Sequence, residues 1–262
     1  MAIFFLVSFL ASVVGAICGI GGGVVIKPVL DMLGLETVTT ISFLSSCTVL
    51  SMSCYSVTRA LLKGDSGVDI HAGTPLAIGA ALGGLAGKQL FELVKSVFEN
   101  QSMVGAVQAA CLGVVTLGTL GYTVNKDRIA THEIAAPGAC VVIGLGLGIM
   151  SSFLGIGGGP INLVVLYFFF SMDTKTAASN SLYIILFSQI ASLLTTLFTD
   201  TVPSFQWPVL MVMVGGGIGG GVVGRLLNKK MDNRLVEQLF IGLMGVIVVI
   251  CIYNVWQLVW TN

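Results

Sequence analysis

Eight long apolar segments dominate the chain and limit what it can fold into. They cover residues 2–35, 38–62, 72–90, 103–124, 134–172, 177–198, 205–227 and 235–260. Only 9% of the 262 residues are charged, whereas roughly 25% are charged in a soluble domain. About 20 apolar residues in a helix span the hydrocarbon core of a bilayer, and a spanning helix satisfies its own backbone hydrogen bonds. The sequence therefore predicts an all-α polytopic membrane protein.

Two of these segments are too long for a single crossing, and each contains a glycine-rich stretch. The stretches are Gly19-Ile20-Gly21-Gly22-Gly23 near the start and Gly155-Ile156-Gly157-Gly158-Gly159 past the middle of the chain. Each glycine destabilises a helix interior by roughly 1 kcal/mol relative to alanine, so both stretches predict a break. Inside a bilayer, non-helical backbone is tolerated only where protein buries it or it lines a cavity. We therefore expect the two stretches at the functional centre.

A second internal match indicates a duplicated chain. Gly83-Gly84-Leu85-Ala86-Gly87-Lys88-Gln89-Leu90 corresponds to Gly220-Gly221-Val222-Val223-Gly224-Arg225-Leu226-Leu227, at nearly the same offset in numbering as the two glycine-rich stretches. Internal repeats of this kind are typical of secondary transporters. We predict two membrane repeats of four segments, residues 1–124 and 134–262, joined by the loop 125–133.

The basic loop residues favour inverted repeats. If segments 2–35 and 134–172 each crossed once, the loop with Arg59 and Lys63 would lie opposite the loop with Lys229 and Lys230. That arrangement violates the tendency of basic loops to be cytoplasmic. If each long segment is instead a hairpin that enters and leaves on one face, nearly all basic loop residues become cytoplasmic. Each half then has one hairpin and three crossings, so the halves face opposite ways and both termini lie outside.

The glycine breaks predict an anion site near the middle of the membrane. A helix that restarts after a break presents unpaired N–H groups and roughly half a positive charge. Pro160 suits such a first turn because proline has no N–H to leave unpaired. A flexible kink without a ligand is the alternative. We expect substrate contacts from Gly19, Gly21, Gly22, Gly23, Val24, Gly155, Gly157, Gly158 and Gly159.

Polar side chains in the apolar segments add further candidates. A single serine in a membrane helix usually bonds its own backbone or a neighbouring helix, whereas amide side chains are costlier to bury. The candidates are Ser42, Ser45, Asn162, Asn180, Ser181 and Gln189. Lys27 is a candidate charge partner, because charges within membrane segments are functional hypotheses by default. Alternatively, its side chain reaches the surface or pairs with Asp31. We expect no acidic proton carrier in mid-membrane.

Two glycine ladders have the spacing that lets membrane helices approach closely. They are Gly79, Gly83 and Gly87, and Gly216, Gly220 and Gly224. We assign them to helix packing, either within one chain or in a homodimer, rather than to substrate.

The sequence lacks the motifs of several other function classes. The six cysteines have no C-x-x-C spacing, and there is no H-E-x-x-H, no G-x-S-x-G and no complete Walker A motif. The net charge is zero, which gives no support for a nucleic-acid partner. We expect a protein of the lipid bilayer that has no enzymatic activity, no cofactor and no metal site.

Taken together, the glycine motif, the two four-segment halves and the length resemble the sulfite exporter TauE/SafE family, also called the toluene sulfonate uptake permease family. The most specific part is the first glycine motif with Pro28 five residues on; the second copy has Val164 at that place and Pro160 instead. The resemblance implies a multi-pass permease of a bacterial or archaeal plasma membrane. It also implies a small sulfur-containing or organic anion as substrate, such as sulfite, a sulfonate or sulfoacetate, and no cofactor.

Three functions are compatible with these features. The first is a secondary transporter that holds an anion between the two hairpin tips and exposes it to each side in turn. The second is an anion channel built on the same helix ends. The third is a membrane scaffold or assembly protein whose glycine ladders bind partner helices, and the inverted-repeat pattern argues against it.

Overall fold

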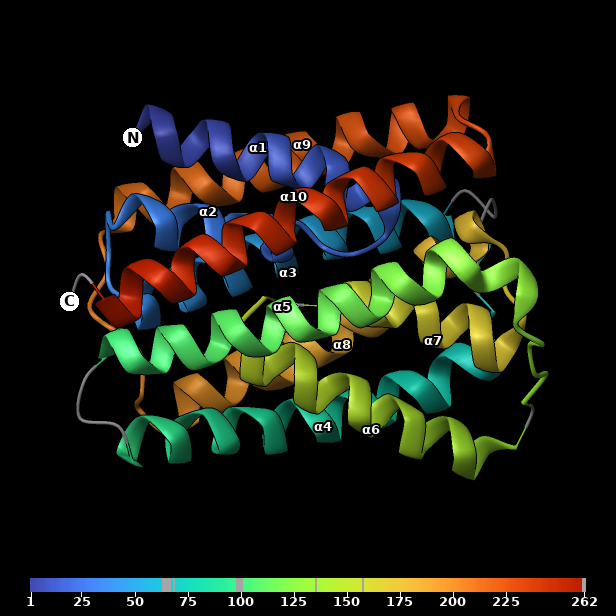
Figure 1. Ribbon diagram of the computed structural model, residues 1–262, viewed down its shortest axis with the longest axis horizontal. Helices are drawn as coiled ribbons and strands as arrows, with labels where there is room; N and C mark the ends of the chain where they lie inside the picture. The colour runs from blue at the N-terminus through green and yellow to red at the C-terminus, as the bar shows by residue number, and fades with distance from the viewer. Residues whose placement is uncertain (63–66, 68, 98–100, 135, 157, 261–262) are drawn as a thin grey trace.

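The protein is a bundle of roughly aligned helices, as its computed structural model shows (Figure 1). The structure describes residues 1–62, 67, 69–97, 101–134, 136–156 and 158–260, so Lys63 and Gly157 lie outside the described residues. Within these ranges every regular element is a helix. Seven helices are long and apolar enough to cross a membrane. The prediction of an all-α polytopic membrane protein is confirmed.

Ten α-helices and one short 3-10 helix follow one another in the described residues. They are α1 (Ala2–Cys18), α2 (Gly23–Leu33), α3 (Val38–Leu62), α4 (Ile70–Val97), α5 (Gln101–Asn125), η1 (Lys126–Arg128), α6 (Pro137–Leu154), α7 (Pro160–Phe170), α8 (Thr174–Phe198), α9 (Trp207–Lys230) and α10 (Asn233–Trp260). Six apolar segments form one long helix each. The two overlong segments form the helix pairs α1/α2 and α6/α7, and the glycine-rich stretches connect the helices of each pair.

Both glycine-rich connections reverse the direction of the chain. Gly19 and Gly21 have φ angles of 73° and 69°, and Gly155 and Gly158 have 63° and 137°, a region that glycine enters without steric penalty. In Figure 1, α1 runs inward from the end where the N-terminus lies and α2 returns toward it. The pair α6/α7 enters and leaves from the opposite end. The second arms begin at Gly23 and Pro160, which places Val24 in the first turn of α2.

The glycine ladders bring the two halves of the chain together. A Cβ on Gly83 of α4 would lie 2.1 Å from the carbonyl oxygen of Leu145 in α6, and one on Gly220 of α9 would lie 2.4 Å from that of Phe9 in α1. The packing role of the ladders is therefore confirmed. These faces are not free to form a homodimer, because a helix of the same chain already covers each of them.

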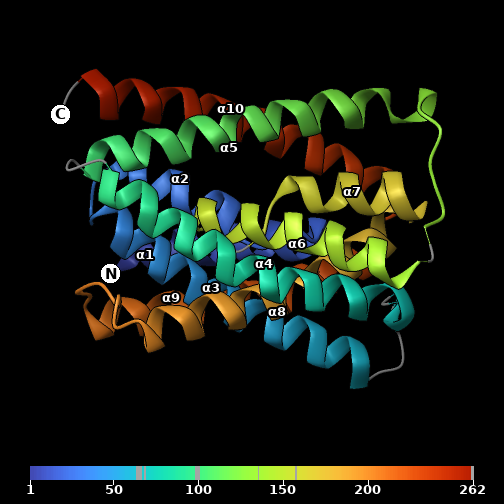
Figure 2. The ribbon, with the colours of Figure 1, turned by 90° about the horizontal axis from the view of Figure 1, so that it is seen from below.

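The remaining helices complete the bundle. The central helices α3 and α8 pack on each other, α3 also packs on α9, and α8 also packs on α4. Helices α5 and α10 lie side by side along one edge, as Figure 2 shows. Because α3 and α8 each contact the hairpin α1/α2, residues from several distant segments meet around the glycine-rich connections.

Basic residues concentrate at one end of the bundle. Helices α3, α5 and α9 finish, and α8 and α10 start, at the end opposite to the chain termini (Figures 1 and 2). The basic residues of these helix ends are Arg59, Lys126, Arg128, Lys175, Arg225, Lys229, Lys230 and Arg234. Lys88 and Lys95 lie in the second half of α4, which runs toward the other end. We call the end of the bundle opposite to the chain termini the basic end.

Candidate functional site

The two glycine-rich connections touch each other inside the bundle. A Cβ on Gly23 would lie 1.8 Å from the carbonyl oxygen of Ile156. A Cβ on Gly158 would lie 3.3 Å from the carbonyl oxygen of Ile20, and both isoleucines are buried. The backbones of the two breaks therefore pack directly on one another, and position 23 has room only for glycine.

Most of the polar residues expected at the site carry a buried oxygen atom that has no hydrogen-bond partner among the described residues. Ser42 lies beside the second break, its Oγ 2.8 Å from where a Cβ on Gly155 would be. The described residues offer no hydrogen-bond partner to a side-chain oxygen of Ser42, Ser45, Asn162, Ser181 and Gln189. Leaving such atoms unpaired is unfavourable by about 1–3 kcal/mol each. These atoms can therefore bind water or a polar ligand.

Asn180, also expected at the site, forms hydrogen bonds within the protein. Its Oδ1 accepts a hydrogen bond from the N–H of Asp69 at 3.0 Å. Its Nδ2 donates to the carbonyl oxygens of Gly67 at 2.7 Å and Thr176 at 2.9 Å. Because these bonds use both amide hydrogens and the oxygen, Asn180 fastens the segment before α4 to α8.

Lys27 forms an ion pair inside the bundle. Its Nζ lies 2.9 Å from Oδ2 of Asp31, and the two side chains are only 3% and 4% exposed. Asn254 of α10 donates to the carbonyl oxygen of Pro28 at 2.9 Å and so fixes the same turn of α2. Of the interpretations open for Lys27, the structure supports the pair with Asp31. An acidic side chain is thus buried in a membrane segment, where Lys27 compensates its carboxylate.

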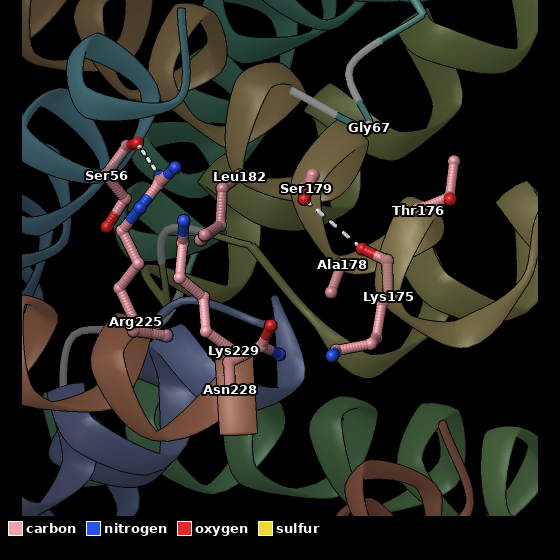
Figure 3. Close-up of a pocket in the computed structure, with 11 residues that line it drawn as sticks. Ser56, Gly67, Lys175, Thr176, Ala178, Ser179, Leu182, Arg225, Asn228 and Lys229 are labelled. Atoms are coloured by element: carbon pink, nitrogen blue, oxygen red, sulfur yellow. Dashed lines mark hydrogen bonds between the residues drawn. The ribbon is translucent and has the colours of Figure 1, made fainter. Parts of the chain in front are cut away.

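A cavity of about 440 Å³ opens at the basic end, between α1, α3, α8 and α9 (Figure 3). It is lined by Ala16, Ser56, Gly67, Lys175, Thr176, Ala178, Ser179, Leu182, Arg225, Asn228 and Lys229. We call it the basic cavity. Three of its lining residues are cations, and none of the described lining residues is acidic. A cavity of one charge sign attracts small ions of the opposite sign, so this one suits an anion.

Neutral backbone groups hold the basic side chains in place. Figure 3 shows Arg225 reaching the carbonyl oxygen of Ser56 in α3, to which it donates a hydrogen bond. Lys175 donates to the carbonyl oxygen of Met231 at 2.6 Å. These carbonyl partners help to orient the two side chains. The buried Oγ of Ser56 has no partner in the described part of the chain and also borders the cavity.

The basic cavity reaches the first glycine break. Ala178, in its wall, lies so close that a Cβ on Gly19 would be 2.2 Å from the Ala178 Cα. Asn228, also in the wall, donates to the carbonyl oxygen of Ile17 at 2.6 Å, directly before the break. A ligand that enters from the basic end would therefore meet the connection between α1 and α2.

The cations of this cavity were not among the residues predicted for the substrate site. None of the predicted substrate residues that the structure describes lines it, although Ser42 and Gly155 line a smaller cavity beside the second break. The available signal was that a cation directly follows a ladder glycine in both repeats, Lys88 after Gly87 and Arg225 after Gly224.

Comparison with known proteins gives the family. Residues 4–251 match the family described as Sulfite exporter TauE/SafE. The chain is also 23% identical over 247 residues to YunE of Bacillus subtilis (strain 168), a protein named as a probable membrane transporter, with 87% of this chain and 88% of that protein covered. No solved structure matches the chain. Because the family match spans nearly the whole chain and the helices fit a multi-pass cell-membrane protein, the chain belongs to the sulfite exporter TauE/SafE family of membrane transporters.

Proposed function

We propose that the chain is a secondary transporter that moves small sulfur-containing or organic anions, such as sulfite or a sulfonate, across the cell membrane. The basic cavity is the observation that carries this proposal. Its Lys175, Arg225 and Lys229 match the charge of such anions, and hydrogen bonds from cationic groups to anionic oxygens are stronger than neutral ones. The hydroxyl of Ser56 supplies a further donor in the same wall.

We also propose that the two repeats, residues 1–124 and 134–262, are inverted in the membrane. The supporting observation is that α1/α2 and α6/α7 enter from opposite ends of the bundle (Figure 1). The tendency of basic residues to lie inside makes the basic end cytoplasmic and puts both termini outside. The basic cavity then opens to the cytoplasm, where an exported anion would enter.

The paired glycine breaks are the proposed mid-membrane site. The N-caps of α2 and α7 are Gly22 and Gly159, which have no side chain to cap the helix. Both helix starts carry the positive end of a helix dipole. Together with the Ser42 hydroxyl beside Gly155, these helix starts would offer N–H and O–H donors to an anion. Unlike the cations of the basic cavity, these donors carry no full positive charge.

An anion channel is the main alternative. It requires a continuous water-filled path, whereas the contact between Gly23 and Ile156 fills the space between the breaks. That packing favours a transporter, in which the path opens to one side at a time. A membrane scaffold is less well supported, because the glycine ladders proposed to bind partner helices already pack on α1 and α6.

Ligand-dependent stability and flux test the proposal. A ligand that binds only the folded protein and is present at 100 times its Kd stabilises it by about 2.7 kcal/mol. We expect one or more of sulfite, sulfate, thiosulfate, taurine, sulfoacetate and simple carboxylates to raise the thermal midpoint of the purified protein. The same anion should show saturable, exchangeable flux in proteoliposomes. Conductance in a planar bilayer would indicate the channel, and a stable partner without any flux would indicate the scaffold.

A further inference from the structure

A second cavity occupies the equivalent place in the other half of the chain. It borders the second glycine break at Gly155, as the basic cavity borders the first at Gly19. The two cavities are lined by equivalent residues of the repeated sequence. The pairs are Thr39 and Thr176, Ser42 and Ser179, and Lys88 and Arg225, which share one offset in numbering, and Ala16 and Ser152, which have the offset of the glycine-rich stretches. We call the second one the Lys88 cavity.

The Lys88 cavity is lined by buried polar groups that the described part of the chain leaves without a partner. Ser42, Gln108 and Ser152 are only 8%, 2% and 6% exposed. Each has a side-chain oxygen for which the described residues offer no hydrogen-bond partner. Packing alone would favour apolar side chains at such positions, because a buried unpaired oxygen is unfavourable. Three of them around one small cavity point to a polar ligand.

Lys88 is held inside the protein by its neighbours. Its Nζ lies 3.1 Å from Oε1 of Glu92 and 5.0 Å from the centroid of the Phe91 ring. Its equivalent, Arg225, donates a hydrogen bond to the carbonyl oxygen of Ser56. An anion that enters the Lys88 cavity would therefore have to displace the Glu92 carboxylate.

The two cavities differ in size and in the end that they face. The Lys88 cavity has a volume of about 30 Å³, room for roughly two water molecules. A surface hollow at that end of the bundle shares Thr39 and Pro203 with it. Phe43 lines the cavity and packs on Phe205, with ring centroids 5.2 Å apart. The Lys88 cavity is thus a narrow space beneath a hollow, and it is far smaller than the basic cavity.

We propose that the Lys88 cavity is a second anion site of the transport pathway, that it serves the membrane face opposite to the basic cavity, and that it is constricted in this structure. This inference rests on the transporter function proposed above. In the open form, an anion would bind Lys88 in place of Glu92 and accept hydrogen bonds from Ser42 and Ser152. Among the described residues, three cations line the basic cavity and one lines the Lys88 cavity. The second site therefore holds the anion more weakly and favours release.

Sided cysteine labelling tests the second site. The six native cysteines are replaced, sulfoacetate flux by this background is verified, and Ser42→Cys, Ser179→Cys and Thr48→Cys are made singly. Vesicles with sulfoacetate on both sides, so that the protein cycles, are treated with a membrane-impermeant maleimide on either face. We expect Ser42→Cys to react only from one face and Ser179→Cys only from the other. Thr48 is a buried neighbour on α3 that bonds Leu44, and Thr48→Cys should react from neither face.

Two kinds of failure can be told apart. If Ser42→Cys reacts from the same face as Ser179→Cys, from both faces or from neither, while the protein transports, the second site is wrong. If the unmodified protein carries none of the proposed anions, the proposed function itself is wrong.

Lys88→Gln and Arg225→Gln give a second test, in which the protein keeps its native cysteines. We expect each variant to raise the half-saturating anion concentration at least about threefold when the anion is supplied on the membrane face that its cavity serves. Equal effects on both faces would overturn the proposal.

Discussion

Lys27 and Asp31 are two opposite charges that pair with each other inside the helix bundle. Their ion pair is almost completely buried in α2. Removing one partner of a buried pair typically destabilises by about 3–5 kcal/mol, whereas replacing both with apolar residues is often neutral or stabilising. The pair has no equivalent in the second half, where Leu163 and Tyr167 stand at the same places after the second glycine motif. The two hairpins are therefore not interchangeable.

We expect Lys27→Met to lower the free energy of unfolding by about 3–5 kcal/mol, because it leaves the Asp31 carboxylate buried without a counter-charge. Adding Asp31→Leu should restore most of the lost stability. Thermal unfolding of the detergent-purified variants measures both effects. A single variant as stable as the unmodified protein would contradict the role of the pair.

Asp173 caps α8 beside the basic cavity. Its carboxylate accepts hydrogen bonds from the N–H groups of Lys175 at 3.1 Å and Thr176 at 3.3 Å, and from the Thr176 hydroxyl at 2.6 Å. Burial opposes ionisation, but these bonds and one from Asn233 together lower the pKa of the Asp173 carboxyl below its ordinary value. The resulting stabilisation is therefore complete above the unfolded-state pKa and is lost as the pH falls through the lower, folded-state pKa.

Asp173→Ala should reduce stability by about 1 kcal/mol at neutral pH, the usual effect of losing a helix N-cap. The difference from the unmodified protein should shrink as the pH falls below about 4, because the unmodified carboxyl then becomes protonated. Unfolding midpoints across this pH range provide the measurement. A difference that stays constant at all pH values would show that the carboxylate charge does not stabilise the helix.

At the scale of helices, the glycine ladders decide which segments touch. A Cβ on Gly83 of α4 would come within 2.1 Å of an α6 carbonyl oxygen, whereas one on Gly146 of α6 would meet no atom within 4 Å. Gly83→Ala should therefore destabilise the protein by about 1–3 kcal/mol through overpacking. Gly146→Ala should stabilise it by up to about 1 kcal/mol, since alanine favours a helix. Equal unfolding midpoints for the two variants would refute the tight α4/α6 contact.

Hydropathy and glycine content predicted the helices well because both act locally. An apolar segment must be helical in lipid, and a cluster of glycines interrupts the helix wherever it packs, so the breaks at 19–23 and 155–159 could be located in advance. The pairing of α4 with α6 and of α1 with α9 could not be predicted in this way, because a glycine ladder specifies close contact but not which helix approaches. The pairing depends on the whole bundle.

The same limit applies to side chains at the site. Asn180 is bound by backbone groups of Asp69 and Gly67, which lie in the other half of the chain, so its structural role has no local signal. Arg225 and Lys229 lie in the last turns of α9, where a cation near a helix end is equally typical of a surface anchor. Only the tertiary contact of α9 with α1 and α3 turns them toward a shared cavity.

At the scale of the whole molecule, two equivalent cavities flank two glycine breaks that touch. The basic cavity is large and lies at one end of the bundle, whereas the Lys88 cavity is small and lies toward the other. The contact between Gly23 and Ile156 lies between the two glycine breaks. Under the proposed function, this difference within a repeated sequence is what we expect of a transporter with one side accessible, and the anion would enter at Arg225 and Lys229.

Saturation of sulfoacetate and sulfite uptake into proteoliposomes tests the entry site most directly. The double variant Arg225→Gln/Lys229→Gln removes two of the three cations of the basic cavity, while Lys230→Gln removes a neighbouring surface charge that does not line it. Losing one charge-assisted hydrogen bond costs about 1.5–3 kcal/mol, so the double variant should raise the half-saturating concentration at least about tenfold. Lys230→Gln should leave it unchanged. The same half-saturating concentration in both variants, with both folded and inserted, would contradict the basic cavity as the anion site.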